Sequence, residues 1–409
     1  MSQVRYAIIG VGGFGGVHLT AAEALEHEGL IKLCAVAEVF ADRHKDKLDA
    51  LRGRGVRVYT DHRDMLTKEP SIDIVSVPTP IHLHVPMTLA CLERGCHVLL
   101  EKPPAVLVQD VDLLTRKAEQ AGRLCQVGFQ STSDALAREL KARLAEGEIG
   151  RVREIVVRGM WQRLDSYYAR ASWAGKLRVG DAWALDGPLN NPLCHYVHEA
   201  LFLAGPMPHG TLRPVSVRAE LYHAHPIEGE DIVCARAELE GGIVLHTYLT
   251  LCAPESQPTT VELVGEKGAA MWRPGYYELT GEAGRSEKQS EPGSTTALMR
   301  NLARAVNGGE ELSSPLAVTR NVILHNNGCF KSSGHVRPVP GDKVRRYRPQ
   351  KEGEVGDVAT EVEGLPDIFE RAARERLLFS EMGVEWAAET PTVEIDFDEF
   401  DPSPLLCAS

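Results

Sequence analysis

A glycine-rich turn between a β-prone run and a helical segment constrains the fold of this chain more than any other feature. The β-prone run Val4 to Ile9 leads directly into the turn, and the proline-free segment Gly16 to Glu28 has helix-forming composition. In such a unit the first glycine makes a tight turn, the second lets the backbone approach a pyrophosphate, and the third lets helix and strand pack closely. The pattern predicts a dinucleotide site whose backbone comes from Gly10, Gly12, Gly13, Phe14 and Gly15.

The residue after the second apolar run indicates which dinucleotide is bound. The run Ile31 to Ala37 ends at Glu38, about 20 residues beyond the loop, where a carboxylate accepts hydrogen bonds from a ribose 2'-hydroxyl. This position favours NAD. Arg43 and His44 follow closely and could hold a 2'-phosphate if the loop folds back, so NADP stays open.

Apolar runs and helical segments alternate through the first third of the chain. Expected strands at 72–77, 96–100 and 124–128 are separated by expected helices at 81–94 and 108–121. This spacing predicts a doubly wound parallel sheet, an α/β fold in which ligands bind at the carboxyl ends of the strands. Three segments would then share one edge with the glycine loop, namely Pro78-Thr79-Pro80, Glu101-Lys102-Pro103 and Gly128-Phe129-Gln130.

Composition excludes several classes of protein. A chain of 409 residues exceeds the usual size of one core, which favours two domains. No run is long enough to cross a bilayer and no secretory signal is evident, so we expect a cytoplasmic protein without a membrane partner. Its net charge of −12 argues against a nucleic acid partner. Nine cysteines without C-x-x-C spacing indicate small buried side chains rather than disulfides or a metal site.

The second half of the chain is richer in β-prone runs. Expected strands lie at 152–160, 215–223, 231–239, 243–251 and 259–265, without regular intervening helices. Residues 296–306, 315–326 and 365–382 have helical patterns, 281–293 is polar and reads as a loop, and the acidic end 394–409 reads as a surface tail. The pattern indicates a sheet-based second domain, with no functional interpretation for 331–362.

In combination these features resemble the glucose-fructose oxidoreductase, inositol dehydrogenase and MocA family. The matching residues are the glycine loop, Thr79-Pro80 with His82 and His84, Glu101-Lys102-Pro103, Gly128-Phe129-Gln130 and Gly147-Glu148-Ile149-Gly150. The resemblance implies a Rossmann domain over 1–128, an α/β domain with a large, open, predominantly antiparallel sheet over 129–330, and a C-terminal extension over 331–409 with one helix packed on the body. It also implies homo-oligomers built through that sheet.

The resemblance further implies the roles of individual residues. Lys102 would exchange a proton with the substrate oxygen and contact both the substrate and the cofactor, and a cis peptide before Pro103 would aim it. Pro78, Thr79, His82, Glu101 and Gln130 would join the glycine loop in binding the cofactor. His195 is the second catalytic candidate, and with Asn191 it would contact substrate. Many members of the family have an aspartate where this chain has Asn191. Because an amide cannot act as a base, Lys102 or His195 becomes the expected proton acceptor.

Two further groups of residues invite a functional interpretation. The segment Leu164 to Gly187 is crowded with aromatic side chains and contains Tyr168 and Lys176, which we expect to contact a sugar-like substrate. The same aromatics would also serve a loop that covers the back of the sheet. His223-x-His225 would place two rings on one strand face, but no third ligand is evident nearby, so no metal site is expected.

Three functions follow as expectations. The leading one is an NAD(P)-dependent dehydrogenase or reductase acting on CH-OH groups of a sugar, inositol or sugar acid, with Lys102 and His195 handling the proton. A second is an enzyme with retained NAD that cleaves glycosides by transient oxidation and elimination. A third is a non-catalytic sensor of dinucleotides. The presence of both Lys102 and His195 argues against the sensor, which has no need of proton transfer.

Overall fold

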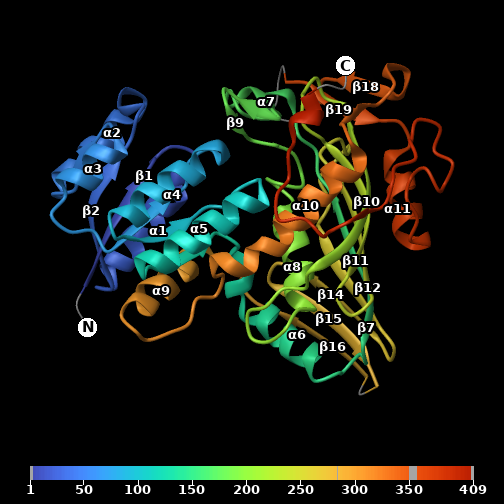
Figure 1. Cartoon of the computed structure of the whole chain (residues 1–409), viewed down its shortest axis with the longest axis horizontal. Helices are drawn as coiled ribbons and strands as arrows, with labels where there is room; N and C mark the ends of the chain where they lie inside the picture. The colour runs from blue at the N-terminus through green and yellow to red at the C-terminus, as the bar shows by residue number, and fades with distance from the viewer. Residues whose placement is uncertain (1–2, 283, 350–356, 407–409) are drawn as a thin grey trace. The chain divides into compact units, whose positions relative to one another are not determined.

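The computed structural model describes residues 3–282, 284–349 and 357–406 of the chain (Figure 1). Contacts divide these residues into two compact units. Unit 1 takes in residues up to 105 together with 109–134 and 293–320, and unit 2 takes in 106–108, 135–292 and residues from 321 onward. The segment 293–320 therefore packs with unit 1, although sequence reasoning placed it in the second domain.

Unit 1 is built on a six-stranded parallel sheet of order β3-β2-β1-β4-β5-β6. All four residues of β4 and most of β1 and β2 are buried, as expected for strands covered on both faces. The predicted doubly wound α/β fold is confirmed. Its strands are β1 (Val4–Ile9), β2 (Ile31–Ala37), β3 (Arg57–Tyr59), β4 (Ile74–Val77), β5 (His97–Leu100) and β6 (Cys125–Val127).

Helices follow the strands of unit 1 in the alternating pattern that the sequence predicts. They are α1 (Gly15–His27), α2 (Lys45–Gly53), α3 (His62–Lys68), α4 (His84–Glu93) and α5 (Val108–Ala121), with 3-10 turns η1 (Ala41–His44), η2 (Ile81–Leu83) and η3 (Gln130–Ser133). The helix α9 (Thr295–Val306) comes from much later in the chain and packs on α1. Its apolar face buries Leu298, Met299 and Leu302 in the core that β1 and β2 share.

Unit 2 is built on a ten-stranded sheet that is mostly antiparallel, which confirms the second half of the fold prediction. The order is β16-β15-β14-β13-β7-β12-β11-β10-β17, with β20 paired to β10, and only β7–β12 and β10–β17 run parallel among its described pairings. The strands are β7 (Val152–Met160), β10 (Pro214–His223), β11 (Ile232–Leu239), β12 (Ile243–Thr250), β13 (Thr260–Gly265), β14 (Ala269–Arg273), β15 (Tyr276–Gly281), β16 (Gly284–Gln289), β17 (Arg337–Pro338) and β20 (Val393–Glu394).

Helices cover the two faces of this sheet unequally. The helices α6 (Ala135–Ala145), α8 (Cys194–Leu203) and α10 (Arg320–Ser333) lie on one side of the strands in Figure 1, and α11 (Leu365–Glu375) lies on the other. Strand β7 alternates accordingly. Gly159 faces Leu193 at the start of α8, whereas Val156 joins the core of Phe369 in α11. The C-terminal extension thus covers part of one face of the sheet through which the resemblance implies oligomers form.

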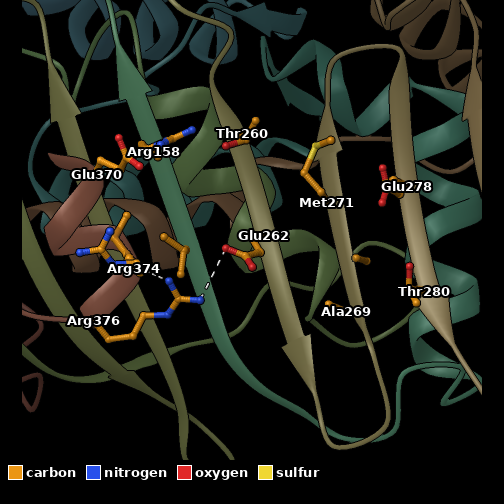
Figure 2. A pocket seen from close by; sticks show the side chains of 13 residues that line it. Arg158, Thr260, Glu262, Ala269, Met271, Glu278, Thr280, Glu370, Arg374 and Arg376 are labelled. Atoms are coloured by element: carbon orange, nitrogen blue, oxygen red, sulfur yellow. Dashed lines mark hydrogen bonds and ion pairs between the residues drawn. The ribbon is translucent and has the colours of Figure 1, made fainter. Parts of the chain in front are cut away.

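Beside α11 the same face is hollowed into a groove of about 650 Å³. Figure 2 shows Glu370, Arg374 and Arg376 reaching into it from one side and Met271 and Glu278 lying on the strands opposite. Arg376 forms ion pairs with Glu154 and with Glu262 on β13. None of the site residues expected from the sequence lines this groove.

Four predictions about elements were wrong. No regular helix was expected between the strands of the second half, yet α8 lies between β7 and β10. The polar stretch 281–293, expected as a loop, contains the edge strand β16. The helix expected over 365–382 ends at Glu375, because Arg376 takes a left-handed conformation with φ of 61°. The segment 315–326 begins as the 3-10 turn η4 (Leu316–Thr319) before α10. Across the described residues, no helix combines the length and the apolar character needed to cross a bilayer.

Candidate functional site

The glycine loop follows β1 at the carboxyl edge of the unit 1 sheet. Gly10 and Gly13 have φ angles of +92° and +49°, which side chains rarely adopt. A Cβ on Gly15 would lie 2.3 Å from the carbonyl oxygen of Gly10, so only glycine lets α1 begin this close to the turn. Phe14, which precedes α1, has a side chain that is 45% exposed. The loop therefore has the shape that sequence reasoning required for a pyrophosphate.

Glu38 lies at the end of β2 beside this loop. One carboxylate oxygen accepts a hydrogen bond from the backbone N–H of Val11 at 2.8 Å, and the other accepts one from Phe40 at 2.9 Å. Val39 and Phe40, which follow, are 70% and 54% exposed, an unusual position for apolar side chains. His44 folds back on Gly12, where a Cβ would meet its ring at 2.6 Å. An apolar surface thus adjoins an anchored carboxylate.

The turn after β4 carries two polar atoms of the expected cofactor site. The Oγ1 atom of Thr79 and the Nδ1 atom of His82 are buried, and neither has a hydrogen-bond partner among the described residues. Burial lowers the pKa of His82, which favours the neutral imidazole. Thr79 lies against the glycine loop, 3.8 Å from the place of a Cβ on Gly10. Buried polar atoms cost free energy when left unbonded, so a ligand or an ordered water that bonded to these two atoms would be stabilised here.

The turn after β5 presents Lys102. Its peptide bond to Pro103 is cis, as the resemblance implied, and the lysine is half-buried. Glu101 is 5% exposed; its carboxylate accepts from the N–H of Lys102 at 3.2 Å and lies 2.9 Å from the Nε2 atom of His18. Gly128 leaves room for this carboxylate, because a Cβ there would be 2.5 Å from it. Gln130 begins η3 and donates to Thr295 at 3.3 Å.

Sequence reasoning assigned no function to two buried histidines at this edge. His84 joins two turns: its Nδ1 atom lies 2.7 Å from the carbonyl oxygen of Pro103, and its Nε2 atom lies 2.8 Å from that of Thr79. Burial lowers the pKa of His84. His18, in the first turns of α1, contacts Glu101. A histidine on the buried face of the first helix of such a unit is the signal that would have found His18.

In unit 2, Asn191 and His195 flank the start of α8. His195 lies in the first turn of the helix, whereas Asn191 lies in the turn before it. The amide nitrogen of Asn191 donates to a carboxylate oxygen of Asp186 at 2.8 Å, and Asp186 also accepts from Gly175 at 2.7 Å. Asp186 is 2% exposed. Asn191 occupies the position where many members of the family have an aspartate, and the carboxylate of Asp186 lies beside it.

Of the two residues expected in a substrate loop, Tyr168 packs against another ring, whereas Lys176 forms an ion pair. Tyr168 lies on α7 (Asp165–Ala169), with its ring centroid 4.7 Å from that of His225. Burial raises its pKa well above the ordinary value. Lys176 is more exposed and pairs with Glu228 at 2.6 Å. The loop also contains a short hairpin of β8 (Arg178–Val179) and β9 (Ala182–Trp183).

His225 belongs to a buried polar cluster with Asp231 and Cys252, whose ligand atoms lie within 4.8 Å of one another. From the sequence, no third ligand was evident near His223 and His225. The cluster instead joins His225 to Asp231, 6 positions away, and to Cys252, and it does not contain His223. Nδ1 of His225 lies 2.8 Å from Asp231, and Nε2 lies 3.0 Å from the carbonyl oxygen of Arg163. Both ring nitrogens of His225 therefore face oxygen atoms. Because Tyr168 packs on this ring, His225 links the segment 164–187 to the sheet.

Two sequence models of one family match the chain. The first, described as "Oxidoreductase family, NAD-binding Rossmann fold", matches residues 4–129, and the second, the GFO/IDH/MocA C-terminal domain, matches residues 137–271. The solved WlbA dehydrogenase from Bordetella pertussis, in complex with NADH and UDP-GlcNAcA, has a TM-score of 0.68 over 81% of this chain and 96% of that chain, at 23% identity. This likeness is one of fold.

Curated relatives match the first part of the chain. Inositol 2-dehydrogenase of Mycolicibacterium smegmatis is 35% identical over 151 residues, 37% of this chain and 42% of that protein. The scyllo-inositol 2-dehydrogenase (NAD(+)) of Bacillus subtilis is 28% identical over 149 residues, 36% of this chain and 42% of that protein. The match spans 42% of the length of either relative. With both domain models matched in order, the chain belongs to the Gfo/Idh/MocA oxidoreductase family.

Proposed function

We propose that the protein is an NAD(P)-dependent oxidoreductase that transfers a hydride between a nicotinamide cofactor and a CH-OH group of a sugar, inositol or sugar acid. The observation that carries this proposal is that the glycine loop, Glu38, Thr79 and Lys102 all follow strands at one edge of the unit 1 sheet. Ligands of open parallel sheets bind at this edge. The inositol dehydrogenases that match the first part of the chain support the substrate class.

The residues present fit a nicotinamide dinucleotide. Gly10, Gly13 and Gly15 open the backbone to a pyrophosphate, Val39 and Phe40 offer an exposed apolar surface to an adenine, and Thr79 has an orphaned hydroxyl. Glu38 supports a preference for NAD, because each carboxylate oxygen keeps lone pairs for ribose hydroxyls and repels a 2'-phosphate.

The chain's own residues would manage the proton. The bound nicotinamide accepts or gives the hydride, while the substrate oxygen gains or loses a proton. We assign that exchange to the Nζ atom of Lys102, with His195 as the second candidate. Asn191 orients a hydroxyl but cannot take its proton. Tyr168 and Lys176 complete the proposed substrate contacts; in the structure Tyr168 packs on His225 and Lys176 pairs with Glu228.

Near-ultraviolet absorbance of the purified protein tests the reaction. The protein is mixed with NAD or NADP and a panel of aldoses, inositols, sugar acids and aryl glycosides. We expect growth of the reduced-nicotinamide signal with at least one polyol, faster with NAD than with NADP. Release of aryl alcohol without net reduction would contradict the proposal in favour of a glycoside-cleaving enzyme with retained cofactor. Binding of NAD with silence across the panel would favour a sensor.

The substitution Lys102→Ala tests the assigned proton carrier. We expect kcat to fall by at least about 100-fold, the usual contribution of a positioned acid or base, while the Kd for NAD changes by less than about twofold. The matched control is Lys117→Ala, which removes an exposed lysine from α5 of the same unit. Unchanged turnover in Lys102→Ala would overturn the assignment.

A further inference from the structure

Behind the Lys102 turn, four buried side chains of unit 1 form a continuous chain of hydrogen bonds. Tyr6 on β1 bonds to Ser76 on β4, the hydroxyl of Ser76 lies 3.0 Å from Nδ1 of His18, and Nε2 of His18 lies 2.9 Å from Glu101. Tyr6, Ser76 and His18 are fully buried. Each side chain comes from a different element, so the chain crosses the interior from β1 to the end of β5.

We assign the donor and the acceptor of each hydrogen bond in this series starting from Tyr6 and ending at Glu101. Burial raises the pKa of Tyr6, which keeps the phenol protonated, so its O–H is able to donate to Ser76. Ser76 then donates to Nδ1 of His18, and Nε2–H of His18 donates to Glu101. With these directions, every side chain in the series has a hydrogen-bond partner. His18 is its last member before the reactive turn.

The carboxylate of Glu101 is held on three sides. One carboxylate oxygen lies against His18, the other accepts from the backbone N–H of Lys102, and Gly128 closes the space on the far side. His84 holds the same turn from its other end, through the carbonyl oxygen of Pro103. The backbone on both sides of Lys102 is thus fixed by a buried histidine of another element.

We propose that His18 is a positioning residue for Lys102, and that it acts by holding the carboxylate of Glu101 against the backbone of the Glu101-Lys102-Pro103 turn. The inference rests on the proposed function, because it concerns the residue assigned to proton exchange. Without His18, the carboxylate loses its side-chain donor and can turn toward the neighbouring amine. An ion pair formed there would hold the proton on Lys102.

Two amide substitutions distinguish positioning from simple loss of stability. The Nε2–H of a glutamine at position 18 reaches the place of the imidazole Nε2, whereas an asparagine reaches only toward Ser76. We expect His18→Asn to lower kcat for polyol oxidation by about tenfold to 100-fold, since small misplacements of reacting groups cost this much, with NAD binding within about twofold of wild type. His18→Gln should restore most of the rate.

The dependence of kcat/KM on pH distinguishes positioning from loss of stability, because a loss of stability alone does not shift this profile. In His18→Asn, the pH at which kcat/KM for oxidation reaches half its maximum should rise by about one unit, as expected for an amine beside a freed carboxylate. The control is Leu25→Ala, which opens a cavity in the same helix α1 without touching Glu101. It should lower the melting temperature and leave the profile unchanged.

Amine labelling of Lys102 in the absence of NAD and substrate separates this inference from the proposed function. Mass spectrometry measures the extent of labelling. At pH 8 the labelling rate in His18→Asn should fall by about tenfold, the consequence of a shift of one unit, and His18→Gln and Leu25→Ala should label as the wild type does. A change in labelling with no wild-type turnover of any polyol would sink the proposed function alone. Normal labelling and a normal pH profile in His18→Asn would overturn the role of His18.

Discussion

Glu38 shows how one side chain can support both its own loop and a ligand. Its two oxygens accept from Val11 and Phe40, which fixes the carboxylate beside the glycine loop. Glu38→Gln should therefore weaken NAD binding about tenfold, since a hydrogen bond to a charged group contributes roughly 1.5–3 kcal/mol. It should also reduce the difference in affinity between NAD and NADP. Isothermal titration calorimetry with NAD and with NADP measures both affinities. Asp42→Asn, an exposed carboxylate nearby on η1, is the control and should change neither.

Glu230 is a carboxyl group whose burial links stability to pH. It is fully buried, accepts from Leu189 at 3.2 Å, and has its pKa raised by burial from the ordinary 4.5 to about 8. Between these values the folded state holds a proton that the unfolded state has lost, so stability falls as pH rises from about 4.5 to 8. Above pH 8 the loss is complete.

Glu230→Gln removes this linkage. The melting temperature of the wild type should drop more between pH 5 and pH 8 than that of the variant, by several degrees, because about 1 kcal/mol corresponds to roughly 2–4 °C in a domain of this size. Differential scanning calorimetry at the two pH values measures the difference. Glu240→Gln, at an exposed hairpin turn, should behave as the wild type. Equal drops in wild type and Glu230→Gln would contradict the assigned linkage.

Some site residues were accessible to sequence reasoning and others were not. The glycine loop, Glu38, Thr79 and Lys102 lie directly after strands, and the carboxyl ends of parallel strands share an edge, so local pattern alone predicts where they gather. His18 was not assigned a function because its partners are distant in the chain, 58 and 83 positions away. His84 and Asp186 each have one partner only 5 positions away, Thr79 and Asn191, across a turn whose shape the sequence pattern does not give. Such pairings depend on tertiary packing, which periodicity does not specify.

At the scale of elements, the C-terminal helix α11 has a packing function that its sequence pattern predicted only in part. Its apolar face places Leu365, Phe369 and Ala372 in a core shared with Tyr248 and Phe379. The pattern gave the start of the helix correctly. Its end was placed too late, since the left-handed turn at Arg376 uses a residue that gives no such signal. The edge strand β16 was missed because its polar sequence lacks alternation of apolar residues.

Phe369→Ala tests how much α11 contributes. Removal of a buried phenylalanine ring should cost about 3–5 kcal/mol of unfolding free energy in unit 2, through lost burial and the cavity left behind. Glu370→Ala is the matched control on the exposed face of the same helix, and it should stay within about 0.5 kcal/mol of wild type. Urea unfolding measures both. A loss below about 1 kcal/mol would mean that α11 contributes little to the core.

At the scale of the whole molecule, the order of segments in the chain differs from their order in space. Residues 293–320 return to unit 1 after the chain has built most of unit 2. A boundary drawn along the sequence assigned them to the second domain, because helical patterns do not reveal which sheet a helix covers. Leu302 in α9 is fully buried beside α1, so the dinucleotide-binding unit depends on a residue far from the glycine loop.

Calorimetry with and without NAD tests this division of the molecule. NAD should raise the unfolding transition of unit 1 by about 2.7 kcal/mol at 100 times its Kd, because it binds the folded unit alone. Leu302→Ala should lower that NAD-sensitive transition by roughly 2–5 kcal/mol and leave the other in place, whereas Phe369→Ala should lower the NAD-insensitive one. Arg304→Ala, on the exposed face of α9, should move neither. If Leu302→Ala instead shifted the NAD-insensitive transition, α9 would belong energetically to unit 2, and the unit that binds the cofactor would end before residue 293.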